Sequence, residues 1–186
     1  MNLCDFIFKP NKMIIGLIGK KQVGKDTVAD YLVKNHDFVK YAYADPLKAA
    51  CKILFLLSDE QLHNNKLKET VDPRWGRTPR QIFQFVGTDL FRKHVDPQFW
   101  VRHFELWVQQ QPRDANIVIS DVRFQNEADV IKKHSGMLIH IKRSNNYVDT
   151  HPSEQQDIRG ADYLIENNSS PENLYKKIEK SLNFSK

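Results

Sequence analysis

The sequence predicts an α/β fold in which a parallel sheet of about five strands carries helices on both faces. Three observations lead to this prediction. Short apolar runs alternate along the chain with longer segments of helical periodicity, as they do in βαβ units. The first run, 13–19, is apolar throughout and stops at a glycine, which is typical of a parallel strand buried on both faces. The chain has 186 residues, of which 40% are hydrophobic, and this is enough for one domain with a sizeable core.

The expected strands and helices follow from run length and from the residues that open each segment. Strands are predicted where apolar and β-branched residues form short runs, at 13–19, 38–44, 116–121, 137–142 and 162–167. Three helices open with Asp or Thr followed by Pro, a pair typical of a first helical turn. The expected helices are 24–36, 45–57, 79–93, 96–111, a segment from after Asp121 to His134, and a last one opened by Ser170-Pro171-Glu172. Residues 58–78 and 143–160 are polar without a period, and we expect them to be irregular.

Composition limits the cellular setting and the partners. The net charge is +5 and the pI about 9.1, which suits either a nucleic-acid partner or a pocket for phosphorylated small molecules. Cys4 and Cys51 form no C-x-x-C pair or disulfide framework, so a reducing compartment is expected. The start of the chain lacks the apolar run of a signal peptide, and no segment has the apolar length of a membrane span. We therefore expect a soluble cytoplasmic protein, with residues 1–12 as an extension.

The turn after the first strand has the spacing of a phosphate-binding loop. Gly19, Gly24 and Lys25 match G-x-x-x-x-G-K, but Asp26 stands where Ser or Thr is usual, and Thr27 comes one place later. A glycine-rich turn between a buried strand and a helix can present several backbone N–H groups to an anion, and the helix adds its positive end. A lysine here can reach the β- and γ-phosphates of a nucleotide. The alternative is an ordinary strand-to-helix turn with a surface lysine.

Acidic residues near this loop suggest a metal site. The carboxylate of Asp26 is a hard oxygen ligand and can replace the usual hydroxyl on Mg²⁺. Asp121 ends the 116–121 strand, the position at which an acid commonly holds Mg²⁺ in phosphate-transferring enzymes. The alternatives are that Asp26 only favours the helix N-terminus and that Asp121 is an ordinary strand end. Arg123, Glu127 and Arg143 lie nearby in sequence, with solvated charges as the alternative interpretation.

The helix predicted from Pro79 has two distinct faces. Arg80, Gln84 and Gly87 fall at i, i+4 and i+7 and form a polar face with a break in it at the glycine. Ile82, Phe83, Val86 and Leu90 form the expected packing face. A ligand or another backbone could approach closely at Gly87; the alternative is an amphipathic helix in which Gly87 only accommodates packing.

Taken together, the motifs resemble those of the deoxynucleoside monophosphate kinases of tailed phages, a branch of the P-loop kinases. The resemblance covers nearly the whole chain from Met13, although the chain is shorter than those enzymes between its second strand and the Arg80 helix. It rests on "GKDT" (24–27), "ADPLKAA" (44–50), "QFVGTDLF" (84–91), "FWV" (99–101), "DVRFQNEA" (121–128), "IHIKR" (139–143), "DTHPSE" (149–154) and "IENNSSPENL" (165–174). In this family Asp followed by Thr is the normal form of the loop.

The resemblance implies a single P-loop kinase domain with a three-layer α/β P-loop NTPase fold over 1–186. It implies an acceptor-binding helical region over about 45–111 and a lid over about 143–160. The implied reaction transfers the γ-phosphoryl group of ATP to a deoxynucleoside 5′-monophosphate, with Mg²⁺. The implied partners are small-molecule nucleotides, with no nucleic acid and no membrane, in the host cytoplasm if the chain is viral. A homodimer is compatible with the resemblance.

The resemblance also implies roles for individual residues. Lys25, Arg123, Arg143 and Asp121 would be catalytic, and Asp26 and Asp121 would hold the metal. ATP would be bound by Gly19, Gln22, Val23, Gly24, Lys25, Asp26 and Thr27, with Asn168 in the 167–169 segment at the adenine edge. The monophosphate would be bound by Lys21, Lys48, Arg80, Gln84, Gly87, Thr88, Trp100, Arg123 and Glu127. For Trp100, a place in the core is the alternative.

Two other functions remain open from the sequence. The first is a P-loop kinase with another phosphorylated acceptor, such as phosphomevalonate, because similar loop and H-x-S-E segments occur there. The second is a basic nucleic-acid-binding module that contacts phosphates without turnover. The second predicts clustered basic residues with exposed aromatic side chains, whereas the basic residues here are scattered among acids.

Overall fold

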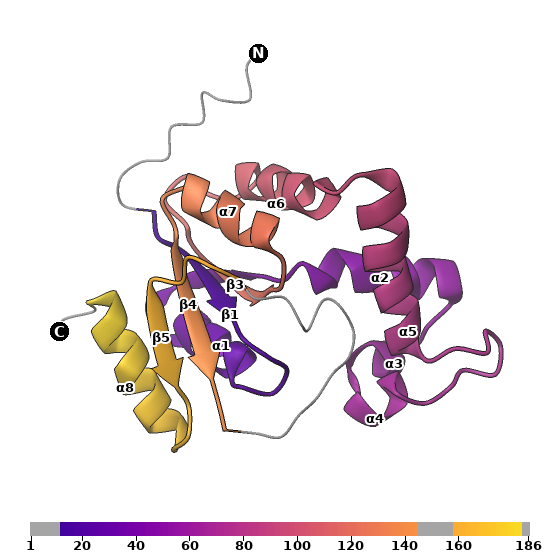
Figure 1. Ribbon diagram of the computed structural model, residues 1–186, viewed down its shortest axis with the longest axis horizontal. Helices are drawn as coiled ribbons and strands as arrows, with labels where there is room; N and C mark the ends of the chain where they lie inside the picture. The colour runs from indigo at the N-terminus through magenta and orange to yellow at the C-terminus, as the bar shows by residue number, and fades with distance from the viewer. Residues whose placement is uncertain (1–11, 145–157, 184–186) are drawn as a thin grey trace, which may run out of the picture. The chain divides into compact units, whose positions relative to one another are not determined.

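The computed structural model describes residues 12–144 and 158–183 (Figure 1). The chain forms two compact units. We call residues 1–42 with 105–186 the sheet unit and residues 43–104 the helical unit. Each unit is described by itself.

The sheet unit contains a five-stranded, wholly parallel sheet, which confirms the predicted fold class. The strands lie in the order β2-β3-β1-β4-β5. They are β1 (Ile14–Ile18), β2 (Phe38–Tyr41), β3 (Asn116–Val122), β4 (Met137–Lys142) and β5 (Tyr163–Glu166). All five residues of the central strand β1 are buried, as its uninterrupted apolar run predicted. The strand predicted at 38–44 is shorter, because a helix begins at Ala44.

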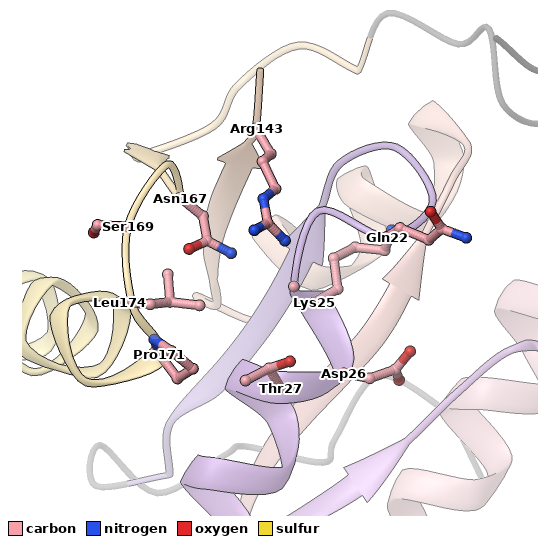
Figure 2. Close-up of a pocket in the computed structure, with 10 residues that line it drawn as sticks. Gln22, Lys25, Asp26, Thr27, Arg143, Asn167, Ser169, Pro171 and Leu174 are labelled. Carbon is pink, nitrogen blue, oxygen red and sulfur yellow. The ribbon is translucent and has the colours of Figure 1, made fainter. Parts of the chain in front are cut away.

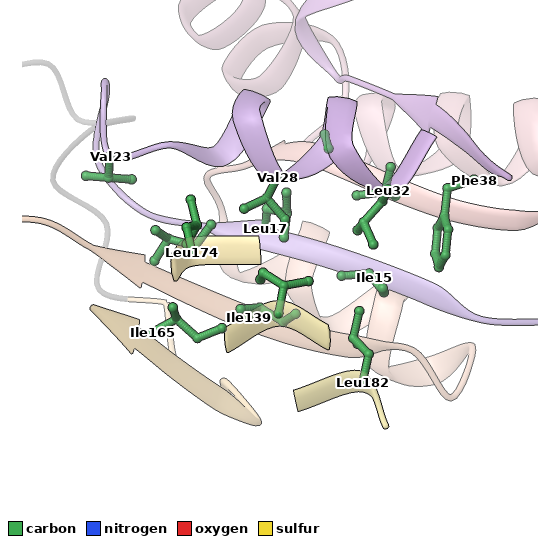
Figure 3. Close-up of a cluster of buried hydrophobic side chains, with 14 residues drawn as sticks. Ile15, Leu17, Val23, Val28, Leu32, Phe38, Ile139, Ile165, Leu174 and Leu182 are labelled. Atoms are coloured by element: carbon green, nitrogen blue, oxygen red, sulfur yellow. The ribbon is translucent and has the colours of Figure 1, made fainter. Parts of the chain in front are cut away.

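Helices cover both faces of this sheet. Helices α1 (Lys25–His36) and α8 (Pro171–Leu182) pack on one face, where Val28, Leu32 and Leu174 join Ile15 and Ile139 in a continuous apolar core (Figure 3). Helix α7 (Gln125–Lys133) covers the other face of β1 and β4. This helix approaches β1 closely, because a Cβ at Gly16 would lie 2.6 Å from the Cδ1 of Ile131. The three layers place the carboxyl ends of the strands at one edge, where ligands bind in such sheets.

The helical unit has a separate core of Cys51, Leu57, Leu62, Ile82 and Val86. Its elements are α2 (Ala44–Phe55), α3 (Asp59–His63), α4 (Asn65–Lys68), α5 (Pro79–Gln84), the π-helical segment η2 (Phe85–Val95) and the start of α6 (Phe99–Gln109). No helix within the described ranges is long and apolar enough to cross a membrane.

One segment prediction was wrong, and one predicted helix differs in type over part of its length. Residues 58–78 were expected to be irregular, but they hold α3 and α4, whose N-caps are Ser58 and Asn64. These helices have five and four residues, too few to show a helical period in the sequence. The helix from Pro79 extends to Val95 and changes to π-helix at Phe85.

Candidate active site

The loop between β1 and α1 has a backbone that only particular residues can adopt. Gly19, Gln22 and Gly24 have φ values of 146°, 66° and 106°. A Cβ at Gly19 would collide with the carbonyl oxygen of Ile141, and one at Gly24 would lie 2.6 Å from the side-chain nitrogen of Asn167. The two glycines of the motif are therefore required both by conformation and by packing.

Lys25 is the first residue of α1, and its side chain folds back over the loop. It is 8% exposed, and its Nζ donates hydrogen bonds to the carbonyl oxygens of Gly19 (2.5 Å) and Lys20 (2.8 Å). Burial and the positive charge of Arg123 lower its pKa from 10.5 to about 8, against the opposing effect of Asp121 and Asp26. An anion beside this ammonium group would compensate the cost of burying its charge.

A pocket of about 280 Å³ opens beside the loop. Figure 2 shows Arg143, which follows β4, pointing toward the loop, and Asn167, which follows β5, with its amide group facing the start of α1. The pocket thus gathers cationic and hydrogen-bonding groups at the carboxyl ends of the strands. Its lining residues are Gln22, Gly24, Lys25, Asp26, Thr27, Arg143, Asn167, Ser169, Pro171 and Leu174.

Asp26 has a partner that the sequence analysis did not foresee. Lys40 of β2 lies 3.2 Å from the Oδ1 of Asp26 and 2.8 Å from the Oδ1 of Asp30. The Asp26 side chain is nevertheless 80% exposed. The position of Lys40 in the sequence does not indicate this ion pair, because the pair depends on β2 lying beside α1.

The chemistry of Asp26 and Asp121 is compatible with Mg²⁺, which prefers oxygen ligands, and their roles at a metal stay predictions. Within the described residues, no group of three or more His, Cys, Asp or Glu side chains is gathered to hold a metal. Mg²⁺ commonly uses one or two carboxylates together with phosphate oxygens and water, so a larger cluster is not needed. Asp26 is exposed at the pocket, and Asp121 affects the pKa of Lys25 from the end of β3.

Glu127 is buried and holds the backbone at Arg123. Its side chain is 2% exposed, and its Oε2 accepts hydrogen bonds from the backbone N–H groups of Arg123 (2.8 Å) and Phe124 (3.2 Å). The role predicted for Glu127 toward the acceptor stays a prediction. The carboxylate fixes the turn between β3 and α7, from which Arg123 extends.

Two residues of the 167–169 segment, which was predicted at the adenine edge, line the pocket, and the contact of this segment with adenine stays a prediction. Asn168 does not line the pocket, and its Oδ1 accepts a hydrogen bond from the backbone N–H of Ser144 (2.9 Å). Its neighbours Asn167 and Ser169 line the pocket instead, together with Pro171 and Leu174 of α8. The apolar period of α8 predicted a packing helix, and it gave no sign that the first turn also borders a pocket. Gly19, Lys21 and Val23 belong to the loop but not to the pocket wall.

In the helical unit, Lys48, Arg80, Gln84 and Thr88 are all partly exposed. Arg80 forms an ion pair with Glu69. Their roles toward an acceptor stay predictions.

Gly87 and Trp100 are placed as packing residues. A Cβ at Gly87 would lie 2.8 Å from the Cδ2 of Leu47, so the glycine lets η2 approach α2. Trp100 is 5% exposed, and its Nε1 donates a hydrogen bond to the carbonyl oxygen of Gly87 (2.9 Å). The indole ring also contacts Phe91 and Phe99. These contacts correspond to the alternative interpretation of both residues, and their predicted roles toward the acceptor stay predictions.

Comparison with known proteins identifies the family. A family model described as deoxynucleotide monophosphate kinase matches residues 12–76 and 57–178. The chain belongs to this family. It is 46% identical over 181 residues to a protein of Acanthamoeba polyphaga mimivirus assigned by name to the same kinases, covering 89% of this chain and 94% of the relative. It is 24% identical over 238 residues to the deoxynucleotide monophosphate kinase of Enterobacteria phage T4, covering 91% of this chain and 98% of the relative.

Solved structures agree with the fold of this deoxynucleotide monophosphate kinase family member. A sugar kinase from Janibacter sp. HTCC2649 has a TM-score of 0.52 and 13% identity, covering 92% of this chain and 95% of the other. TT1252 from Thermus thermophilus has a TM-score of 0.52 and 15% identity, with coverages of 95% and 99%. At these identities the likeness concerns the three-layer α/β P-loop fold.

The lid expected over about 143–160 is described only in part. Arg143 lines the pocket, and Arg159 donates its backbone N–H to the Oε1 of Gln125 (2.9 Å). Residues 145–157, with the motif at 149–154, lie outside the described residues.

Proposed function

We propose that this kinase transfers the γ-phosphoryl group of ATP to a deoxynucleoside 5′-monophosphate, which yields the diphosphate and ADP. The observation that carries the proposal is the buried Lys25 in its glycine loop, beside a pocket that also receives Arg143. Membership in the deoxynucleotide monophosphate kinase family supports the choice of acceptor.

The ATP side of the reaction needs positioning and charge compensation more than covalent chemistry. The backbone N–H groups of the loop would hold the phosphates, and Thr27 would add a hydroxyl. Lys25 would exchange its bonds to the loop carbonyls for phosphate oxygens. Arg143 would meet charge on the transferred group, and Arg123, which lies close enough to lower the pKa of Lys25, would add a second guanidinium.

Mg²⁺ would be held by Asp26 and Asp121 together with phosphate oxygens, and it would supply further neutralisation of the phosphate charge. The Oδ1 of Asp26 is engaged by Lys40, and the side chain remains largely exposed to a ligand.

In the helical unit, the acceptor monophosphate would be bound by Lys48, Arg80, Gln84 and Thr88. The roles of Lys21 and Arg123 toward the acceptor stay predictions. The phosphate of the acceptor is the nucleophile and is already ionised near neutral pH, so the residues that bind it need to orient it and not to remove a proton. Gly87 and Trp100 would then act indirectly, by shaping the helical unit that carries the binding residues.

The test is ADP release measured with each of the four deoxynucleoside and four ribonucleoside monophosphates, and with phosphomevalonate. We expect turnover with one or more deoxynucleotides and lower kcat/KM with each ribonucleotide. Turnover with phosphomevalonate alone would instead support the alternative hypothesis of a P-loop kinase with a different phosphorylated acceptor. Acceptor-independent ATP binding without any turnover would exclude both.

Arg80 separates the acceptor side from the ATP side. Arg80→Ala should raise the KM for the monophosphate by roughly tenfold or more, because a guanidinium–phosphate contact is worth a few kcal/mol, and it should leave the KM for ATP nearly unchanged. Glu69→Gln, which removes the present partner of Arg80, is the matched control and should not weaken acceptor binding. A larger change in the KM for ATP than in the KM for the monophosphate would show that Arg80 binds ATP and not the acceptor.

A further inference from the structure

Asn167 connects the far end of the sheet to the phosphate loop. It follows β5 directly, is 7% exposed, and donates its backbone N–H to the carbonyl oxygen of Lys142 (2.7 Å) at the end of β4. Its side-chain Nδ2 donates a hydrogen bond to the carbonyl oxygen of Val23 (2.8 Å), 144 residues away in the sequence. The side chain is thus held from its own backbone and directed at one peptide group of the loop.

That peptide group includes the N–H of Gly24. In a trans peptide, the C=O and the N–H point in opposite directions from one rigid plane. A donor that fixes the carbonyl oxygen of Val23 therefore also fixes the direction of the Gly24 N–H. Gly24 lines the pocket, and its φ of 106° is one that side-chain-bearing residues rarely adopt.

The contact between Asn167 and Gly24 also leaves no room for a side chain at Gly24. A Cβ at Gly24 would lie 2.6 Å from the Nδ2 of Asn167 and 3.4 Å from the Cδ2 of Leu174. The amide group of Asn167 therefore packs directly against the turn into α1 (Figure 2). Buried amide groups with a single well-made bond of this kind orient the groups that they contact.

We propose that Asn167 is a positioning residue for the ATP phosphates, acting through the Val23–Gly24 peptide. The inference rests on the proposed function, since it assumes that the loop binds phosphate. It differs from a contact with adenine, which the place of Asn167 in the 167–169 segment would otherwise suggest. The side-chain amide donates one of its N–H groups to the loop, so the loss of this bond should weaken binding of the phosphate end of ATP and spare the base end.

The experiment uses the full-length kinase and two inhibitors that report the two ends of ATP separately. Inorganic tripolyphosphate probes the phosphate end, and adenosine probes the base end, each as the inhibition constant against ATP. Asn167→Asp keeps the shape of the side chain and replaces the NH₂ donor by an oxygen that opposes the Val23 carbonyl. Asn167→Ala removes the donor without adding charge. Asn173→Asp, on the exposed side of α8, is the control for an added negative charge.

We expect Asn167→Asp to raise the inhibition constant for tripolyphosphate by tenfold or more and that for adenosine by less than twofold. Asn167→Ala should show the same ratio with smaller values, and it decides the question if the Asp variant does not fold. Asn173→Asp should match the wild type in both.

Three results would overturn the inference. Equal losses for both inhibitors would mean a general structural role, and a loss confined to adenosine would mean a contact with the base. Unchanged constants in a folded Asn167→Asp protein would show that the loop is positioned without Asn167. Failure of the proposed function would be distinct, because the wild-type protein itself would then release no ADP with any deoxynucleotide.

Discussion

A lysine that is 8% exposed and donates its hydrogen bonds to carbonyl oxygens within the described residues would be a poor choice for stability alone, because burial opposes its charge. The cost of burying this ammonium group is explained if Lys25 binds a phosphate. Lys25→Met should therefore fold and lose turnover by roughly two or more orders of magnitude, because the transferred group loses its main cationic partner. Steady-state ADP release together with circular dichroism checks this. A folded Lys25→Met protein with wild-type turnover would remove Lys25 from the mechanism.

The lowered pKa of Lys25 also predicts a pH dependence. With a pKa of about 8, the ammonium form falls from about nine-tenths at pH 7 to about one-tenth at pH 9 in the free protein. Bound phosphate favours that form, so the Kd for ATP should rise by up to roughly tenfold over this range. Calorimetric titration at pH 7 and pH 9 measures this Kd. The control is Lys25→Met, which should bind ATP weakly and with the same Kd at both pH values.

The contribution of Lys25 to the stability of the fold changes with pH in the opposite direction to ATP affinity. The unfolded chain keeps this proton up to about the ordinary value of 10.5, whereas the native chain releases it near 8. Between these values the unfolded state binds more protons, so the contribution of Lys25 to the free energy of unfolding rises with pH. Below pH 8 the cost of burying the charged group is fully present.

At the scale of elements, the strands could be predicted from their short apolar and β-branched runs, and the long helices from their period and opening residues. β4 was placed at 137–142, where the structure has it. The short helices α3 and α4 depend on caps at Ser58 and Asn64 and not on a period, so they were missed. The glycine loop was predicted from local spacing alone. The bond from Asn167 to Val23 spans 144 residues and depends on strand order, which no local pattern contains.

The π-helical segment η2 allows a test of its own glycine. A Cβ at Gly87 would point toward the methyl end of Leu47, which can move. Gly87→Ala should change the free energy of unfolding by less than about 1 kcal/mol, because better helix propensity offsets the tighter packing. Gly87→Val should destabilise by about 1–3 kcal/mol, since its branched side chain fits less easily. Denaturant unfolding gives both values.

The same variants decide whether a ligand approaches this part of η2. We expect the KM for the monophosphate to stay unchanged in Gly87→Ala, because the new methyl group faces α2. A tenfold rise in that KM without loss of stability would show that the acceptor comes close to Gly87 after all.

At the scale of the whole molecule, the residues proposed for ATP and most of those proposed for the acceptor fall in different compact units. The loop, Lys25 and Arg143 belong to the sheet unit, whereas Lys48, Arg80, Gln84 and Thr88 belong to the helical unit. If each unit binds its own substrate, each ligand alone should stabilise a different part of the chain. A ligand present at a hundredfold excess over its Kd stabilises the form that binds it by about 2.7 kcal/mol, which hydrogen exchange readily detects.

ATP alone should slow amide exchange in the 19–25 loop and at the start of α8, and a deoxynucleoside monophosphate alone should slow it in α5 and η2. The physical reason is that exchange requires local opening, and a bound ligand must leave before its contacts open. Lys25→Met should lose the protection by ATP and keep that by the monophosphate, whereas Arg80→Ala should do the opposite. Mass-spectrometric exchange on the wild type and both variants, each with either ligand and without ligand, measures this. Monophosphate protection confined to the sheet unit would show that the acceptor residues of the helical unit were assigned wrongly.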